Sequence, residues 1–347
     1  MGKYLKEFEL TSQYEEYINS TMALLPNVSL VNETTGVFYN SIVDYTQQCI
    51  TFEALEDGTF SFTKSGTGDD IQYSKDNGNT WTPLVSGETV SVVTGDKVMW
   101  KSTITPKYNT GIGTFSSSNK FNVYGNAMSL LYGDGFIGQT SIESKKYTFT
   151  KLFWKNSGLF DASNLILSAT TLVNECYCWM FNGCTSLTTA PELPATTLYS
   201  SCYYNMFSGC TSLTMAPKLP ATILSEHCYK SMFSRCTSLT TAPKLPATTL
   251  ANYCYSHMFS GCTSLTTAPE LPATTLDYNC YVQMFYDCTS LNHITMLATD
   301  IPSSNCLSSW VTGVSSTGTF VKHPDMESLP TGTSGIPNSW TVVDYTA

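Results

Sequence analysis

The C-terminal half of the sequence repeats itself every 26 residues. The stretch CTSLTTAPELPATTL at residues 184–198 returns letter for letter at residues 262–276. The same period produces two columns of cysteines: Cys176, Cys202, Cys228, Cys254, Cys280 and Cys306 in the first, and Cys184, Cys210, Cys236, Cys262 and Cys288 in the second. A fixed period of this size is typical of a solenoid, because a single unit cannot bury its apolar face without a neighbour. We therefore predict a solenoid over residues 148–322, with coils stacked about 4.8 Å apart and short parallel strands along one side.

The repeated apolar residues are the expected core of this solenoid. A divergent unit, with Leu152 and Phe153 at the Met-Phe position of the repeat, precedes the array and is expected to cap its N-terminal end. Trp310 takes the methionine position at the other end, where a large ring would close the core. The strict period also favours core packing for the tyrosine that follows five of the first-column cysteines. The columns are Met180-Phe181, Met206-Phe207, Met232-Phe233, Met258-Phe259 and Met284-Phe285; Leu187, Leu213, Leu239, Leu265 and Leu291; and Tyr177, Tyr203, Tyr229, Tyr255 and Tyr281.

The order and spacing of these fixed positions resemble the BspA-type leucine-rich repeat. The matching segments in this sequence are LPATTL, CYYNMF, GCTSL and TMAP, and they cover about residues 148–322 with small variations. The resemblance implies a right-handed solenoid that has no catalytic machinery of its own.

Residues 49–147 are predicted to form a small β-sandwich-like domain, so that the chain as a whole is mainly β. Runs such as TFSFT and TVSVV alternate apolar and polar residues between turns rich in Gly, Asp and Asn. Within this domain, SKDNGNTW at residues 74–81 matches the Asp-box, a hairpin motif of sialidases in which the aspartate, here Asp76, binds its own turn. A sialidase would need several such boxes and a cluster of arginines to grip a carboxylate. The chain has one box and one arginine, Arg235, so we interpret the motif as a folding device.

Two short segments at the ends complete the predicted organisation. Residues 1–48 contain a possible short helix beginning at Thr11 or Ser12, followed by two apolar runs around a turn, and are too small to fold alone. We expect them to be a docking segment. The pattern LPNVSL…YN in this segment resembles virion-associated proteins of phages that infect gut Bacteroides-type bacteria, and related bacterial repeat proteins. Residues 323–347 follow the last recognisable unit and are predicted to be a C-terminal tail.

The cysteines are predicted to be buried free thiols. Stacking would bring same-column cysteines within the distance that a disulfide tolerates, so disulfides remain the alternative. The total of thirteen is odd, however, and thiols are among the groups most often buried. No zinc site is expected, because the two cysteines of one unit are eight residues apart and none of the four histidines follows the period.

Charge and hydropathy exclude several classes of partner. The formal net charge is −10, and the lysines are scattered singly, so there is no basic stripe to bind nucleic acid. No run of eighteen apolar residues is present, and the N-terminus lacks the apolar core of a signal peptide, so neither membrane insertion nor export is expected. No constellation of nucleophile and base and no phosphate loop emerges, so we expect no enzyme activity and no cofactor.

The positions that vary between units are the candidate ligand-binding site. They precede each first-column cysteine or follow each column tyrosine, and would line one face of the solenoid. Exposed aromatic, histidine and lysine side chains suit a glycan or a protein. The alternative is that these positions drift because nothing constrains them. The candidate residues are Tyr199, Tyr204, His227, Lys230, Tyr253, His257 and Tyr278.

These features predict a non-enzymatic binding protein. The favoured interpretation is a fibre-like phage virion component, homo-oligomeric, whose solenoid binds a host cell-surface protein or glycan and whose residues 1–48 contact other virion proteins. The alternative is a BspA-like bacterial cell-surface adhesin whose signal peptide is missing from this sequence. The missing export signal and the reduced cysteines favour the virion, because virions assemble in the host cytoplasm.

Overall fold

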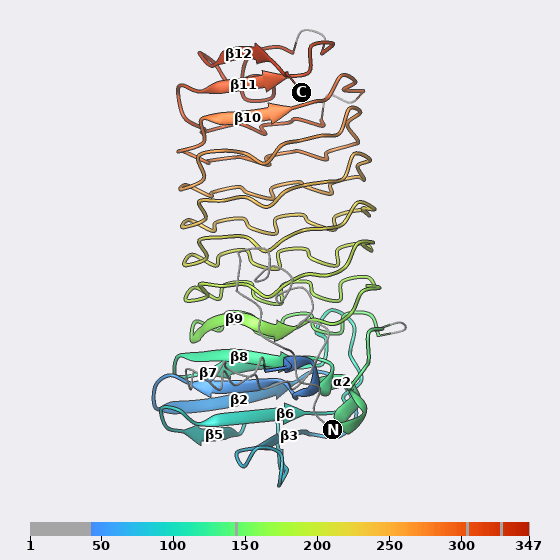
Figure 1. Cartoon of the computed structure of the whole chain (residues 1–347), viewed down its shortest axis with the longest axis vertical. Helices are drawn as coiled ribbons and strands as arrows, with labels where there is room; N and C mark the ends of the chain where they lie inside the picture. The colour runs from blue at the N-terminus through green and yellow to red at the C-terminus, as the bar shows by residue number, and fades with distance from the viewer. Residues whose placement is uncertain (1–42, 143–144, 303–304, 327–328, 347) are drawn as a thin grey trace, which may run out of the picture.

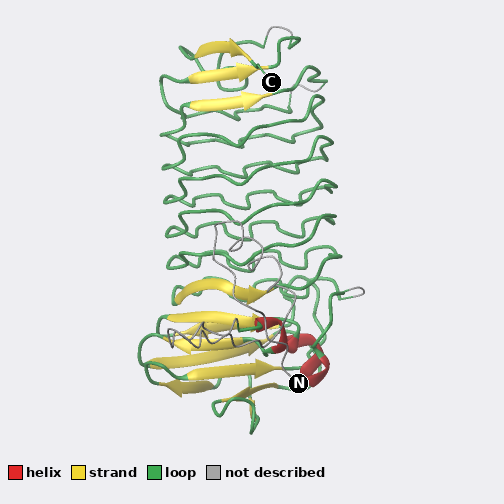
Figure 2. Ribbon diagram, in the orientation of Figure 1, coloured by secondary structure: helices red, strands yellow, loops and turns green. Residues whose placement is uncertain are grey.

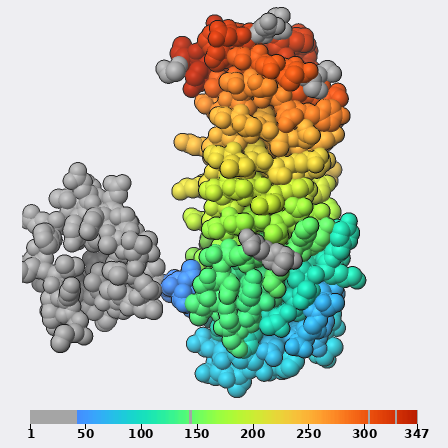
Figure 3. Space-filling model, turned by 90° about the vertical axis from the view of Figure 1, so that its right-hand side faces the viewer, coloured from blue at the N-terminus to red at the C-terminus, as the bar shows by residue number. Residues whose placement is uncertain are grey.

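The computed structural model describes residues 43–142, 145–302, 305–326 and 329–346, and in this part the chain is mainly β. The described residues form an elongated column, with two packed sheets at one end and a pile of similar chain turns, here called coils, at the other (Figure 1, Figure 3). The predicted docking segment 1–48, including the expected helix from Thr11 or Ser12, lies outside the described residues except for its last six. Those six contain the short 3-10 helix η1 (Tyr45–Gln47).

Twelve strands in the described residues make three sheets (Figure 2). A six-stranded sheet has the order β4 (Thr82–Leu84), β3 (Ile71–Ser74), β6 (Lys97–Lys101), β1 (Thr51–Ala54), β8 (Phe121–Asn126) and β9 (Leu159–Ile166). A three-stranded sheet has the order β5 (Thr89–Val92), β2 (Gly58–Lys64) and β7 (Gly113–Ser117). The third has the order β10 (His293–Met296), β11 (Thr319–Lys322) and β12 (Thr341–Asp344), and the short helices α2 (Ser129–Tyr132) and η2 (Gly133–Gly135) follow β8.

The first two sheets pack face to face around a cluster of aromatic rings. Alternation along β1 and β2 turns Phe52 and Phe60 inward, where both are fully buried. The Phe52 ring lies 5.3 Å from Phe60 and 4.7 Å from Phe115 of the opposite sheet, edge-on in both cases. Such edge-to-face pairs are each worth about 0.5–1.5 kcal/mol beyond the area that they bury.

The Asp-box segment is the hairpin between β3 and β4, which pair in antiparallel fashion. Asp76 Oδ1 accepts hydrogen bonds from the Thr80 backbone N–H (2.9 Å) and the Ser74 hydroxyl (2.7 Å), and Oδ2 accepts one from the Thr80 hydroxyl (2.6 Å). These bonds hold the pKa of Asp76 down at about 2, because they stabilise the ionised carboxylate. All of these bonds are made within its own turn.

The boundary predicted at residue 147 does not separate two bodies. Strand β9 lies beyond that boundary, yet it pairs in parallel with β8 and is part of the six-stranded sheet. Phe153, expected to cap an exposed end, packs 5.8 Å from both Phe52 and Phe115 on one side and stacks 5.5 Å from Phe181 on the other. One apolar core therefore runs from the sheets into the coils, and the edge of the sheet is covered by the first coil.

From residue 148 onward, side chains 26 residues apart stack directly on one another. The phenylalanine column from Phe181 to Phe285 has centroid spacings of 5.3 to 5.8 Å, and the column tyrosines lie 5.8 to 6.1 Å apart. All of these rings are fully buried, so the tyrosines belong to the core. This arrangement explains why the same residues recur in successive units, because each ring packs against the equivalent rings of the preceding and following coils.

All thirteen cysteines are buried and none forms a disulfide. The second column has an additional role, because each thiol donates a hydrogen bond to a phenylalanine carbonyl of the preceding coil. Cys210 Sγ, for example, lies 3.1 Å from the Phe181 carbonyl oxygen. An alanine would fill this small site without donating, which is a physical reason for a thiol there.

The backbone of each coil alternates between two hydrogen-bond partners. Tyr177 and Trp179 donate their N–H groups to carbonyls 25 residues further on, at 3.0 and 2.9 Å, whereas Cys178 and Met180 donate three residues back, at 3.3 and 3.2 Å. Every second N–H therefore joins one coil to the next, and the others close tight turns within the coil. The pattern satisfies buried backbone groups without a helix or a continuous strand.

The tight turns require a left-handed backbone at every fourth residue. In one coil these positions are Ser201, Asn205 and Gly209, with φ of 56°, 54° and 76°. The third position is glycine in four units, but it is Arg235 (φ 60°) in one unit and Asp287 in another. A left-handed conformation costs a residue with a Cβ roughly 1–2 kcal/mol.

We expect Arg235→Gly to stabilise the protein by about 0.5–1 kcal/mol, because relief of this strain exceeds the added flexibility of glycine in the unfolded chain. Urea unfolding measures the change. The matched control is Ser234→Gly, one residue away with no positive φ, which should destabilise the protein by a similar amount. A loss of stability in both variants would mean that the backbone at residue 235 is not left-handed.

Regular strands form only in the coils that lack a proline at one position of the unit, which corrects the expectation of short parallel strands in every unit. Pro191, Pro217, Pro243 and Pro269 occupy one column, and between residues 167 and 292 adjacent coils share only isolated parallel bridges. The corresponding residues in β9, β10 and β11 are Ser163, Thr295 and Val321. Proline has no N–H to donate to a ladder, so its presence confines pairing to single bridges.

The C-terminal segment predicted to be a tail is part of the folded column. Its strand β12 pairs in parallel with β11, and Ile336 and Trp340 are buried. Trp310, expected to close the core, is fully buried and donates its indole N–H to the Gly335 carbonyl (2.8 Å). The sequence of this last turn differs from the repeat, which is why the period did not reveal it.

Candidate functional site

The structure gathers five of the seven predicted site residues on one side of the column. His227 stacks on Tyr253 with ring centroids 4.7 Å apart, and Tyr253 meets Tyr278 edge-on at 5.5 Å. Lys230 Nζ lies 5.2 Å from the Tyr253 ring and 5.8 Å from the Tyr204 ring. These residues come from successive coils, so the contacts run along the column axis.

The other two predicted residues do not join this cluster. Tyr199 is 44% exposed and makes none of these ring contacts. The Nδ1 atom of His257 lies 2.7 Å from the Ser256 hydroxyl, so its ring is held by its own neighbour in sequence.

Four residues outside the predicted set, Lys151, Trp154, Lys155 and Trp179, extend the cluster toward the sheets. Trp179 packs 5.4 Å from Tyr204, and Lys151 Nζ lies 4.8 Å from Trp179 and 5.7 Å from Trp154. His257 occupies the same left-handed column three units after Trp179, so following this column back to the first regular unit would have found Trp179. We call the whole set the aromatic strip, defined as Lys151, Trp154, Lys155, Trp179, Tyr204, His227, Lys230, Tyr253 and Tyr278.

The lysines supply the positive charge of the strip. Burial, together with the charge of Lys230, lowers the pKa of His227 despite the opposing effect of Glu226, whose carboxylate lies 3.4 Å from the imidazole. The His227 ring is therefore mainly neutral near pH 7. Lys151, Lys155 and Lys230 each lie over an aromatic ring, in a cation–π arrangement that fixes the ammonium groups between the rings.

The described residues offer little catalytic chemistry. Ser256 and His257 have the spacing of a nucleophile and its base, but Ser256 is fully buried, so no substrate reaches its hydroxyl. The cysteines are buried as well. Within the described ranges, no group of three His, Cys, Asp or Glu side chains could hold a metal ion, and no helix is long and apolar enough to cross a membrane.

Comparison with protein-family models, curated proteins and solved structures finds no match to this chain.

Proposed function

We propose that this chain is a non-enzymatic binding protein whose repeat region is a leucine-rich-repeat solenoid of the BspA type, stacked on a β-sandwich-like domain. The aromatic strip is its ligand-binding surface and takes an extended glycan on the host cell surface. The observation that carries the proposal is the continuous series of ring and lysine contacts from Trp154 to Tyr278 along the column.

The spacing and chemistry of the strip suit a linear sugar chain. Rings on successive coils are 4.7 to 5.5 Å apart, about the length of one pyranose unit, so consecutive sugars can pack their C–H groups against the exposed sides of consecutive rings. The lysines between the rings donate hydrogen bonds to hydroxyl or carboxylate oxygens. A flat, one-sided strip of this kind binds through many small contacts.

We further propose that the protein is a homo-oligomeric, fibre-like component of a phage virion, with residues 1–48 as the segment that contacts other virion proteins. Thirteen buried thiols are compatible with folding in a reducing cytoplasm, where virions assemble. In the alternative proposal the protein is a bacterial surface adhesin, which would bind its ligand through the same strip but would be carried on a bacterial cell rather than on a virion.

The test of the strip is a triple variant, Trp179→Asn, Tyr204→Ala and Tyr253→Asn, in which asparagine suits the left-handed backbone at residues 179 and 253. Loss of three stacking rings, at about 0.5–1.5 kcal/mol each, should weaken attachment to whole bacterial cells at least about tenfold. The matched control replaces three exposed apolar residues outside the strip, Phe160, Met215 and Ile223, by alanine and should leave attachment unchanged.

A truncation that begins at residue 43 tests the docking segment. It removes only residues that precede the described fold, so it should attach to cells as the full chain does but fail to enter particles. If the strip variant attaches to cells as well as the parent does, the strip is not the ligand-binding surface. If the truncated chain enters particles normally, residues 1–48 are not the docking segment.

A further inference from the structure

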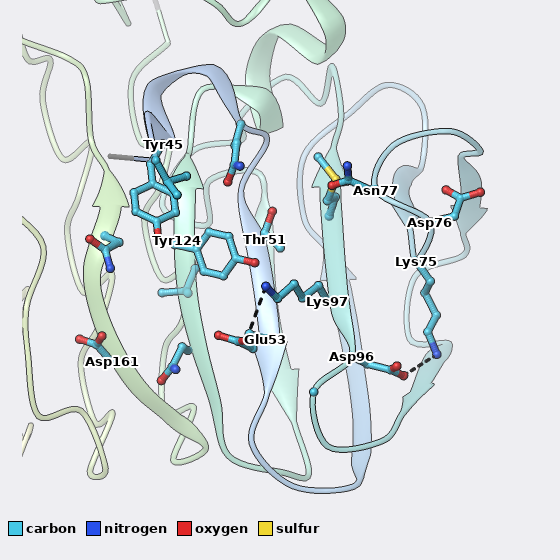
Figure 4. A pocket seen from close by; sticks show the side chains of 17 residues that line it. Tyr45, Thr51, Glu53, Lys75, Asp76, Asn77, Asp96, Lys97, Tyr124 and Asp161 are labelled. Carbon is cyan, nitrogen blue, oxygen red and sulfur yellow. Dashed lines mark ion pairs between the residues drawn. The ribbon is translucent and has the colours of Figure 1, made fainter. Parts of the chain in front are cut away.

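The six-stranded sheet carries a concave surface whose charge differs from that of the aromatic strip. A cleft of about 650 Å³ opens on the outer face of β9, β8, β1 and β6. Tyr45 of η1 stands at one end, and the Asp-box hairpin, with Lys75 to Asn77, forms the other wall (Figure 4). This volume is typical of a small-molecule site.

Strand register arranges the floor of the cleft in two rows that cross four strands. One row is polar: Asp161 pairs with Asn122, Asn122 with Glu53, and Glu53 with Lys97. With strands about 4.8 Å apart, the row is about 14 Å long.

The second row lies two residues along the strands and is more apolar. It runs from Asn164 through Tyr124 and Thr51 to Met99. Tyr45 packs against Tyr124, with centroids 5.2 Å apart, and widens the aromatic surface. A ligand lying across the strands would therefore meet an apolar strip on one side and a line of hydrogen-bonding groups on the other.

The charges of the cleft disfavour an acidic ligand. Glu53, Asp76, Asp96 and Asp161 face only two lysines. Both lysines are already paired, Lys97 with Glu53 at 3.8 Å and Lys75 with Asp96 at 2.8 Å.

Asp161 makes no ion pair with another described residue and remains an acceptor. It receives hydrogen bonds from the N–H and hydroxyl of Ser163, and its carboxylate has further lone pairs for a ligand hydroxyl. Burial and the nearby charge of Glu53 raise the pKa of Tyr124 to about 12, so its hydroxyl stays protonated and can donate.

We propose that this cleft is a binding site for a neutral saccharide of two or three pyranose units, separate from the aromatic strip. The C–H faces of the sugars lie on Tyr124, Tyr45 and Met99, and their hydroxyls donate to Asp161 and Glu53 and accept from Asn122. A pyranose has this division into an apolar face and a polar rim. The site thus differs from the lysine-bearing strip in its charge and in its preference for a neutral ligand.

The experiment uses the full chain and a panel of neutral tri- to hexasaccharides of glucose, galactose, mannose and xylose, with trigalacturonate and spermidine as charged probes. Saturation-transfer NMR identifies the binders, and isothermal titration gives their affinities. We expect saturable binding of at least one neutral saccharide. Tyr124→Ser should weaken it about two- to tenfold through loss of the stacking ring.

Asp161→Asn keeps the size of the side chain and its acceptor for Ser163, so it separates loss of the site from loss of the fold; we expect it to weaken the same binding several-fold. The strip variant serves as the control and should bind the saccharide as the parent does. Absence of binding by every neutral saccharide would overturn the proposal, as would selective binding of trigalacturonate or spermidine. The proposal is also overturned if the cleft variants bind the saccharide with full affinity, or if the strip variant loses affinity for it. None of these outcomes tests whether the strip attaches the protein to cells.

Discussion

Replacing Phe233 by alanine is expected to lower the free energy of unfolding by about 3–5 kcal/mol, the cost of removing a buried phenylalanine from a core that cannot collapse around the gap. Phe233 is fully buried between Phe207 and Phe259, whose rings lie 5.7 and 5.8 Å away and nearly parallel to it. Both neighbours are fixed by backbone hydrogen bonds between coils, so they cannot move into the cavity. Urea unfolding followed by circular dichroism measures the loss.

The matched control for this prediction is Asn252→Ala, an exposed substitution in the next coil. Only the backbone carbonyl of Asn252 takes part in the hydrogen bonds between coils, so loss of its side chain should lower the free energy of unfolding by less than about 0.5 kcal/mol. Similar losses in the two variants would mean that core and surface are inverted.

The second large effect concerns the thiols. In denaturant without reductant, we expect a thiol reagent to find close to all thirteen cysteines, because none is in a disulfide. In the native protein the same reagent should react at least about a thousandfold more slowly. Burial raises the pKa of Cys176, Cys228, Cys236 and Cys288 from 9.0 to about 12, and at pH 8 this lowers the reactive thiolate fraction by about that factor.

The pH dependence follows from the same shift. Because the folded-state pKa values lie above those of the unfolded chain, the thiols stay neutral through pH 8, and stability should fall only as pH rises above about 9, where the unfolded chain ionises and the folded chain does not. Recovery of three or fewer thiols in denaturant would contradict the prediction and would remove the argument for cytoplasmic assembly.

The sequence was a sufficient guide to the buried columns and to the mainly β character of the chain. The period predicts burial of Met232, Phe233, Leu239 and the column tyrosine Tyr229, and all four are buried. Identical side chains stack on one another in this core, so each contact is visible in the sequence as a repeated residue. The Asp-box was equally readable, since its hydrogen bonds join residues no more than four apart.

What the sequence did not reveal depends on contacts between unlike segments. The pairing of β8 with β9, the packing of Phe153 on Phe52, and the burial of Trp340 each join parts of the chain that share no pattern. The cleft on the six-stranded sheet was missed for the same reason, because its rows exist only once the register of four strands is known.

The candidate strip was predicted in part. Tyr204, His227, Lys230, Tyr253 and Tyr278 come together, but variability alone could not tell them from Tyr199 and His257. Side-chain direction at each position depends on where the left-handed residues fall, and those positions are held by Ser, Asn, His and Tyr as well as by glycine.

The alternating hydrogen-bond pattern also makes the column modular in length. Each coil donates one row of N–H groups to the carbonyls of the next coil and accepts the same row of hydrogen bonds from the coil before, at a constant offset. A gain or loss of one 26-residue unit would therefore leave the hydrogen bonds between the other units unchanged. The length of the aromatic strip can thus be increased or decreased by one coil at a time, while the two ends that close the column stay as they are.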